Sequence, residues 1–219
     1  MKERLESFER TTLEGLGVRR LLLRGNDPAR AILELERCAG IDAILMPTYG
    51  TGPFRKLNLG SVTESVLQRA DCPVWTSVHQ EGTTDFDRKA IRKIVCAVDR
   101  DSRARRVLAW ARDFTRKVGA ALTLVHAIAP VHRTRENVGP EELRRNGEAA
   151  LNRRLDEFGF QADVHVEIGN VTPVVTTATK NLNTDLLVIG RSTESGPFGS
   201  IETNSYSLIR HSNCPVVSV

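Results

Sequence analysis

Residues 42–78, DAILMPTYGTGPFRKLNLGSVTESVLQRADCPVWTSV, have a second version in residues 185–219, DLLVIGRSTESGPFGSIETNSYSLIRHSNCPVVSV. Each segment begins with an aspartate and a short apolar stretch and contains Gly-Pro-Phe. A stretch with periodically spaced apolar residues then leads to Cys-Pro-Val. The similarity extends upstream, where VRRLLLRGNDPARAILE, from Val18, resembles VHVEIGNVTPVVTTATK, from Val164. Because these features recur in the same order, we infer an internal repeat.

Apolar periodicity along the chain predicts alternating strands and helices. One helix is expected at 2–15, and further helices are expected at 28–39, 61–70, 102–118, 139–158, 172–181 and 203–211. Strands are expected at 18–24, 42–46, 73–78, 93–99, 121–128, 162–168, 185–189 and 215–219. Such alternation is typical of an α/β fold with a doubly wound parallel sheet.

The repeat divides the chain into two unequal copies. Residues 92–219 are expected to form a complete domain, whereas residues 1–80 form a partial domain that lacks counterparts of its first two strands and first helix. The polar stretch at 81–91 is expected to be a linker. In the partial copy, residues 18–24 are expected either to lie directly beside 42–46 or to leave a gap in the sheet.

The amino-acid composition limits the classes of function that this protein can have. The 219 residues are 40% hydrophobic, 26% charged and 5% aromatic with a net charge of +4, so we expect an ordinary core and no nucleic-acid-binding surface. No apolar run is long enough to span a bilayer, and the charged opening MKERLESFER does not resemble a signal peptide. The four cysteines lack zinc-like spacing and are expected to be reduced, mostly buried thiols in a cytoplasmic protein.

The stretch VCAVDRDSRARRVLAWARDFTRKVGAALTLVHAI, from Val95, and the two segments ending in Cys-Pro-Val resemble the universal stress protein family. The resemblance covers nearly the whole chain and implies an adenine nucleotide alpha hydrolase-like fold. In the ATP-binding members of the family, the phosphates lie in a loop of the form G-x2-G-x9-G-[ST]. An aspartate at the end of the first strand and the backbone after a histidine of the second strand contact the nucleoside. Glycines allow close backbone approach, and a helix N-terminus favours anions.

In the first copy, the resemblance assigns nucleotide contacts to Gly50, Gly60, Ser61 and Val62. Pro47 stands where the first glycine of the loop belongs, and proline removes an N–H group and fixes φ. This copy also lacks the strands that would hold the adenine and the ribose. The first copy therefore retains most of the phosphate loop without a nucleoside site.

In the second copy, the resemblance assigns the nucleoside contacts to Asp99 and the backbone of Ala127, and a loop contact to Gly190. Thr193 and Glu202, however, stand where the second and third glycines belong. A carboxylate about 4 Å from a phosphate charge costs roughly 4 kcal/mol at an effective dielectric constant of about 20. Neither copy therefore has a complete ATP site.

Simpler interpretations of the same residues stay open. Asp99 can cap the helix expected near residue 102, and Ser61 can form a capping box with Glu64, which would make the loop a structural turn. His126 lies in an apolar strand, as a packed core histidine would. Because no nucleophile and base have a spacing typical of catalysis, and no residues have that of metal ligands, we predict neither an enzyme nor a metal site.

The resemblance favours a stress-response or regulatory module with weak or absent ATP binding. One alternative is an ATP-binding protein with slow hydrolysis, whose site combines the first copy's loop with a partner chain. Another is an interaction scaffold whose basic helices hold an acidic partner.

In the family the last strands of two copies pair, so 73–78 should pair antiparallel with 215–219. Because the partial copy leaves apolar surface uncovered, we also expect a homodimer. The sequence does not identify a regulatory protein partner.

Overall fold

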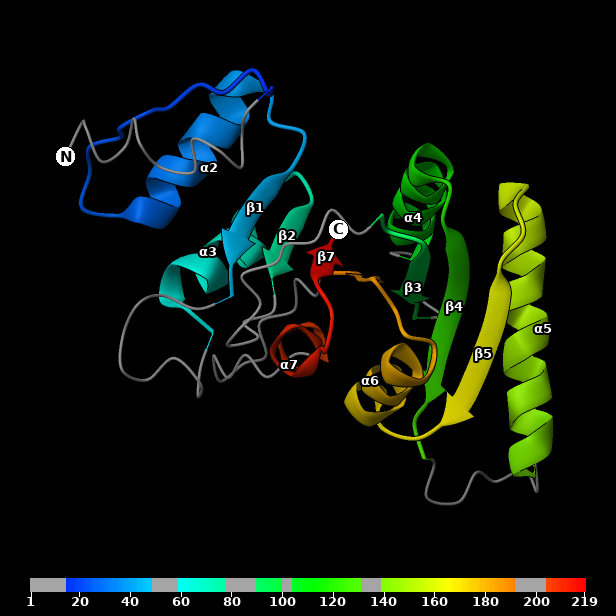
Figure 1. Cartoon of the computed structure of the whole chain (residues 1–219). Helices are drawn as coiled ribbons and strands as arrows, with labels where there is room; N and C mark the ends of the chain where they lie inside the picture. Colours follow the sequence, from blue (N-terminus) through cyan, green and yellow to red (C-terminus); the bar gives the residue numbers. More distant parts are fainter. Residues whose placement is uncertain (1–14, 49–58, 78–89, 100–103, 131–138, 192–203) are drawn as a thin grey trace.

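The computed structural model describes residues 15–48, 59–77, 90–99, 104–130, 139–191 and 204–219. They contain one sheet of seven strands in the order β1–β2–β7–β6–β3–β4–β5 (Figure 1). The strands are β1 (Ile44–Pro47), β2 (Val74–Ser77), β3 (Lys93–Ala97), β4 (Ala121–Ile128), β5 (Asp163–Ile168), β6 (Leu186–Ile189) and β7 (Val216–Ser218). The helices are α2 (Pro28–Ala39), α3 (Ser61–Arg69), α4 (Ala104–Val118), α5 (Pro140–Phe158), α6 (Val171–Asn181) and α7 (Asn204–His211). Each of these elements lies close to where periodicity predicts it, whereas the helix expected at 2–15 lies almost entirely outside the described residues.

Five adjacent strands, β7, β6, β3, β4 and β5, are parallel. From β3 the chain continues to β4 and β5 on one side and later reaches β6 and β7 on the other. The predicted doubly wound α/β arrangement is therefore confirmed for this group of strands. In such a sheet, ligands bind at the carboxyl ends of the strands where the strand order reverses. We call this place, at the carboxyl ends of β3 and β6, the switch point.

The expected antiparallel pairing of the two final strands is also confirmed. The register places Trp75 of β2 opposite Val217 of β7, and Val74 opposite Ser218. Because β1 is parallel to β2, both strands run against the other five. The complete sheet is therefore mixed rather than parallel throughout.

The strand expected at residues 18–24 is absent, so this prediction was wrong. The similar segment later in the chain forms β5, which pairs with β4, and none of the described residues before β1 forms a strand that could replace β4. Residues 18–24 therefore neither extend the sheet beside β1 nor form a strand across a gap from it, and β1 is the edge strand. Leu21, Leu22 and Leu23 are 41%, 48% and 46% exposed, and Leu45 on β1 is 73% exposed. The first part of the chain thus has an uncovered apolar surface.

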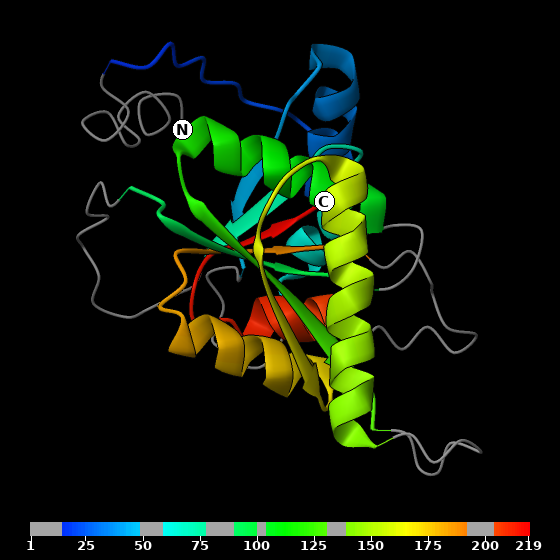
Figure 2. The same ribbon diagram turned by 90° about the vertical axis from the view of Figure 1, so that its right-hand side faces the viewer.

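Helices cover both faces of the sheet. The helices α2, α3, α6 and α7 pack on one face, where Leu33 and Leu187 belong to one core cluster. On the other face, α4 and α5 enclose a second cluster that includes Leu108 and Val188. Figure 2 shows α4 and α5 on one side of the strands and α6 and α7 on the other. Consecutive residues of β6 therefore enter different cores, as expected for a strand buried on both faces.

Helix α2 illustrates why most predicted boundaries are accurate. Asp27 caps it by accepting a 3.0 Å hydrogen bond from the N–H of Arg30, and Pro28 occupies its first turn. At the other end, Gly40 has a φ of +61°, in the left-handed region that favours glycine. These signals are local in the chain, so the sequence alone reveals them.

An aromatic contact joins β2 to α4. The Trp75 ring packs edge-on against Phe114 with ring centroids 5.9 Å apart, and Phe114 stacks on Trp110 at 4.8 Å. This contact spans the junction that the pairing of β2 with β7 creates.

We expect Trp75→Leu and Phe114→Leu to be coupled, because either substitution removes the same edge-to-face contact. A double-mutant cycle measured by urea unfolding should give an interaction energy of about 0.5–1.5 kcal/mol. Trp75→Leu combined with Phe160→Leu, whose ring packs against Phe158, is the control and should be additive to within about 0.5 kcal/mol. An interaction energy near zero for the first pair would show that this contact does not join the two parts.

Candidate functional site

Two residues predicted from the sequence lie at the switch point. Asp99 follows the end of β3 and is exposed, and its carbonyl accepts a 3.2 Å hydrogen bond from Nη1 of Arg154 on α5. Gly190 directly follows β6, and its carbonyl accepts a 2.8 Å bond from the hydroxyl of Ser205. A Cβ atom at this glycine would lie 3.2 Å from Cγ2 of Val107, so the close approach of α4 favours glycine here.

Ala127, the third predicted residue, lies on β4 next to the switch point. The ladder between β3 and β4 ends at Val125, whose carbonyl accepts a 3.0 Å bond from the N–H of Val98. Because alternate residues of a parallel strand direct their backbone groups to the same neighbour, the N–H and C=O of Ala127 also face the β3 side. Asp99, Ala127 and Gly190 thus come from three adjacent strands and meet at one end of the sheet.

The buried position of His126, with 5% of its surface exposed, confirms that it packs in the core. Its Nδ1 lies 2.9 Å from the carbonyl oxygen of Val98. Since a carbonyl oxygen only accepts, this contact requires the proton on Nδ1 and leaves Nε2 for another partner.

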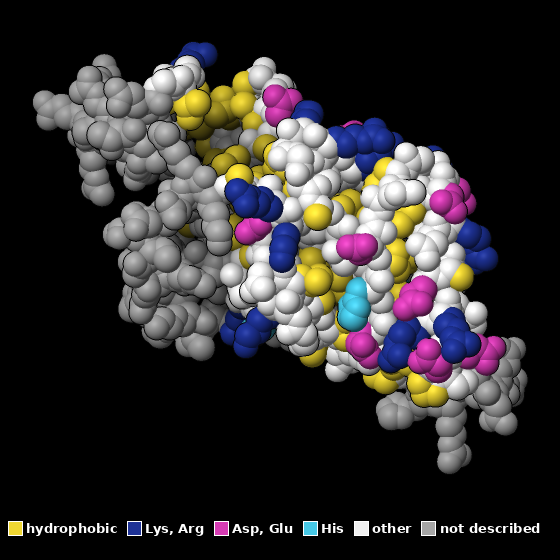
Figure 3. Space-filling model, turned by 45° about the vertical axis from the view of Figure 1, so that its right-hand side comes forward, with side chains coloured by type: hydrophobic (Ala, Val, Ile, Leu, Met, Phe, Trp, Pro, Cys, Tyr) yellow, Lys and Arg dark blue, Asp and Glu magenta, His cyan; other side chains and the backbone are white. Residues whose placement is uncertain are grey.

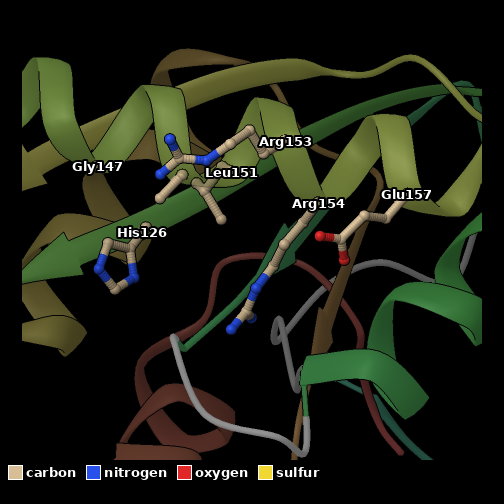
Figure 4. Close-up of a pocket in the computed structure, with 7 residues that line it drawn as sticks. His126, Gly147, Leu151, Arg153, Arg154 and Glu157 are labelled. Carbon is tan, nitrogen blue, oxygen red and sulfur yellow. The ribbon is translucent and has the colours of Figure 1, made fainter.

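A hollow of about 250 Å³ lies between β4 and α5. It is lined by His126 of β4 and by Gly147, Leu151, Arg153, Arg154 and Glu157 of α5 (Figure 4). In this view the side chain of Arg154 points away from α5, and its bond to the carbonyl of Asp99 connects the hollow with the switch point. The sequence analysis missed both arginines, because on the sequence they belong to an ordinary charged helix face.

The N-terminus of α3 differs from the capping box considered above. The helix begins at Ser61, so the N-cap residue is Gly60, which has no side chain to cap the first N–H groups. The capping-box prediction was wrong because Ser61 lies one position too late to act as the N-cap, and the N–H of Glu64 donates a 2.8 Å bond to the carbonyl of Gly60. Val62 is half-buried in the first turn, and Gly50 lies outside the described residues.

The two retained parts of the predicted site point in different directions. α3 follows the carboxyl end of β1, whereas Asp99 and Gly190 follow β3 and β6. Because β1 and β2 are antiparallel to β7 and its parallel neighbours, their carboxyl ends point the opposite way at the junction. The structure therefore does not bring Gly60, Ser61 and Val62 together with the switch point of the same chain.

A series of polar contacts links the switch point to the first part of the chain, and the sequence analysis did not predict it. Arg191, the residue after Gly190, donates hydrogen bonds of 2.6 Å and 2.9 Å to the carbonyls of Ala70 and Cys72. The N–H of Cys72 in turn donates a 2.7 Å bond to Oε1 of Glu36 on α2. Glu36 is only 5% exposed, so this carboxylate serves as a buried acceptor.

Burial and neighbouring charges alter the acidity of this cluster. Burial alone would raise the pKa of Glu36, but the N–H groups of Cys72 and Asp71 and the charge of Arg191 outweigh it, so the pKa is lowered. Burial and the nearby charge of Arg106 lower the pKa of Arg191. Burial and the contact with Glu36 raise the pKa of the Cys72 thiol to about 11, so this thiol is a poor nucleophile at neutral pH.

Several other predictions fall on residues that the structure does not describe. They concern Thr193, Glu202 and most of the linker at 81–91. Within the described residues, no group of three or more His, Cys, Asp and Glu side chains could hold a metal ion. Over the same part of the chain, every helix is too short or too polar to cross a membrane.

The charged side chains are mixed on the face shown in Figure 3. Lys and Arg side chains there are interspersed with Asp and Glu. Polyanion binding depends on basic side chains gathered on one surface. This face therefore does not have the charge distribution of a nucleic-acid interface.

The chain resembles known proteins along most of its length. Residues 2–77 and 90–219 match the model of the universal stress protein family. A Thermus aquaticus protein, "Universal stress protein in QAH/OAS sulfhydrylase 3'region", is 41% identical over 80 residues, which cover 34% of this chain and 58% of that protein. A solved universal stress protein from Archaeoglobus fulgidus aligns with a TM-score of 0.72 and 21% identity over 99% of this chain and 76% of that one. A putative universal stress protein from Pseudomonas aeruginosa aligns with a TM-score of 0.72 and 18% identity over 100% of this chain and 77% of that one.

Other universal stress proteins have been solved with nucleotides. One from Archaeoglobus fulgidus is in complex with dAMP, and one from Arabidopsis thaliana has AMP bound. Their TM-scores with this chain are 0.44 and 0.42, so their ligands are properties of those proteins alone.

We expect Glu36→Gln to lower the free energy of unfolding at neutral pH by about 1–3 kcal/mol, because a neutral amide is a weaker acceptor for two buried N–H groups. The folded-state pKa of Glu36 is lowered, so its stabilisation is present above the unfolded pKa and is lost as the pH falls through the folded pKa. Urea unfolding at decreasing pH should therefore show a difference that shrinks below about pH 4.

Glu34→Gln is the matched control for this measurement. Glu34 lies on the same helix in an exposed ion pair with Arg30, so its substitution should change stability by less than about 0.5 kcal/mol. A deficit of Glu36→Gln that persists unchanged in acid would argue against a stabilising carboxylate.

Proposed function

Because the chain belongs to the universal stress protein family, we propose that it is a regulatory module that binds an adenine nucleotide weakly at the switch point. One observation carries this proposal: three adjacent strands bring Asp99, the backbone of Ala127 and Gly190 to the same end of the sheet. The aspartate can accept hydrogen bonds from the ribose hydroxyls. The backbone groups of Ala127 can pair with the edge of the adenine.

The proposed weakness of binding rests on the loop after Gly190. Thr193 and Glu202 stand where the family's ATP-binding members have glycines. A side chain at those positions restricts the close approach of backbone N–H groups, and the carboxylate repels a triphosphate by roughly 4 kcal/mol per close charge pair. The module should therefore favour a ligand with fewer phosphate charges than ATP.

We also propose that the chain is a tandem of an abbreviated and a complete copy. Its parts are residues 1–80, the linker 81–91 and residues 92–219. Matching registers support this division, since Ile44 pairs with Val74 as Leu187 pairs with Val216. The amides of Ile44 and Leu187 each donate a 2.9 Å bond to the proline carbonyl that precedes the neighbouring strand.

A second candidate function is slow ATP hydrolysis at a site shared between two chains. The N-terminus of α3 favours it, because its N-cap residue, Gly60, has no side chain to bind the first N–H groups, and helix N-termini bind anions. The nucleoside contacts would have to come from a partner chain, since β1 and β3 direct their carboxyl ends differently.

Isothermal titration with AMP should give a dissociation constant weaker than the micromolar range. Asp99→Asn should weaken it by about tenfold, because the loss of a charged acceptor costs on the order of 1.4 kcal/mol. Asp113→Asn is the control, since Asp113 is bonded to Arg112 on the surface of α4, away from the switch point. Equal affinities for the wild type and Asp99→Asn would place the nucleotide elsewhere.

Gly60→Glu separates the two candidate functions. A carboxylate at the start of α3 would repel a phosphate bound there, but it would not touch the switch point. If Gly60→Glu binds the nucleotide as the wild type does, the first function is supported. If the wild type binds ATP tightly and Gly60→Glu does not bind it, the shared site is supported.

We further propose that the uncovered apolar surface of the first copy binds a second copy of the chain. Leu45 and three consecutive leucines at 21–23 are exposed there, and large exposed apolar patches on a protein mark interaction sites. Pairing of β1 with a strand of the second copy is disfavoured. The backbone N–H of Ile44 bonds towards β2, so the backbone groups of Leu45 and Pro47 face the free edge of the sheet, and Pro47 has no N–H to donate there. The carbonyl of Pro47 already accepts a 2.9 Å bond from Thr63. The dimer contact is therefore apolar.

Light scattering at tens of micromolar should show a dimer for the wild type. Leu45→Glu should be monomeric, because a carboxylate buried against apolar side chains is costly. Val118→Glu is the control, since Val118 is a 40% exposed residue at the end of α4, and it should stay dimeric. A monomeric wild-type protein would overturn this proposal.

A further inference from the structure

We propose that the hollow between β4 and α5 is a phosphoryl subsite that makes this chain selective for nucleoside monophosphates. The inference rests on the proposed function, because it assigns the nucleoside to the switch point and the phosphate to the hollow. It adds Arg153, Arg154 and His126 to the site, none of which belongs to the glycine-rich loop.

The position of the hollow is the first argument. Arg154 lines it and also donates a 3.2 Å hydrogen bond to the carbonyl of Asp99. His126 lines it from β4, directly before Ala127. A ligand held by Asp99 and Ala127 at the switch point therefore has the hollow beside it.

The charge of the lining is the second argument. Two arginines and a histidine face one carboxylate, that of Glu157. In Figure 4, Arg153 extends along α5 towards the His126 side of the hollow, while Arg154 points away from the helix. Guanidinium groups match phosphoryl oxygens in geometry as well as in charge. Within the lining of the hollow, two guanidinium groups against one carboxylate favour an anion of low charge.

His126 supplies the third argument. Its Nδ1 is held 2.9 Å from the carbonyl of Val98, and the ring is only 5% exposed, so its orientation is fixed. The remaining nitrogen, Nε2, is an acceptor in the neutral ring and a donor in the protonated ring. A phosphoryl group beside Nε2 can therefore form a hydrogen bond with it.

The size of the hollow limits what it can hold. At about 250 Å³ it is smaller than the roughly 300–1,000 Å³ typical of sites for whole small molecules. It therefore suits one phosphoryl group and not a complete nucleotide. A monophosphate would place its single phosphate here, whereas a triphosphate would also have to place two more charged groups near Glu157 or outside the hollow.

Calorimetric titrations with AMP, adenosine, ATP and inorganic phosphate test the proposal. In the wild type, AMP should bind at least about tenfold more tightly than adenosine or ATP. Arg154→Gln and Arg153→Gln should each weaken AMP about tenfold and leave adenosine unchanged, because only the phosphoryl contact is lost. Arg145→Gln is the control: Arg145 lies on the same helix, pairs with the exposed Glu141 at 3.5 Å, and should behave as the wild type.

The NMR signals of the His126 imidazole provide a readout that does not depend on the nucleoside. Inorganic phosphate should shift them in the wild type and in Arg145→Gln but not in Arg154→Gln, and His126→Gln identifies the signals. If adenosine binds as tightly as AMP, or if Arg154→Gln binds AMP like the wild type, the subsite is overturned while the proposed function stands. If neither nucleoside nor nucleotide binds, the proposed function fails, and the imidazole response to phosphate alone decides the subsite.

Discussion

The antiparallel pairing of β2 with β7 is the constraint on which the rest of the arrangement depends. It joins two groups of parallel strands into one sheet, with Trp75 opposite Val217. Both cores cross this junction, since Val74 of β2 and Val216 of β7 belong to one cluster and Trp75 of β2 packs against the cluster that contains Val217 of β7. The pairing also reverses the direction of β1 and β2 relative to the other strands. The start of α3, which follows the carboxyl end of β1, therefore lies away from the switch point, where ligands of such a sheet bind.

A second connection crosses the same junction through buried polar groups. Arg191 begins the loop after β6, yet its guanidinium binds carbonyls in the turn between α3 and β2. Thr179 lies six residues before Asp185, as Glu36 lies six residues before Asp42, and it donates a 2.8 Å bond to Asn213, which precedes Cys214 as Asp71 precedes Cys72. The two turns before β2 and β7 are thus held in comparable ways, one by charged and one by neutral side chains. The charged version connects the start of the loop after Gly190 to α2, because Cys72 accepts a hydrogen bond from Arg191 and donates one to Glu36.

The sequence predicts what depends on local signals and misses what depends on contacts between distant residues. Apolar periodicity, caps and Pro or Gly at helix ends lie within a few residues of each other. The pairing of the final strands was predicted from the resemblance to the family. The strand at 18–24 failed although its apolar pattern is correct, because the similar segment β5 pairs with β4, and the described residues before β1 contain no strand that corresponds to β4. The switch-point residues could be predicted by resemblance, whereas Arg191 with Glu36, and Arg154 with His126, come together only in the fold.

Most residues of the proposed site lie in one continuous segment of the chain. Asp99, His126, Ala127 and the arginines of α5 all lie within the stretch that runs from β3 through α5, residues 93–158. This stretch has no counterpart among the described residues before β1. A chain that lacks it loses the nucleoside contacts, the hollow and the helices that cover one face of the sheet together, while the start of α3 and the strands β1 and β2 can still form. The position of the proposed ligand site and the uncovered apolar surface around Leu45 therefore both follow from the restriction of this stretch to the later part of the chain.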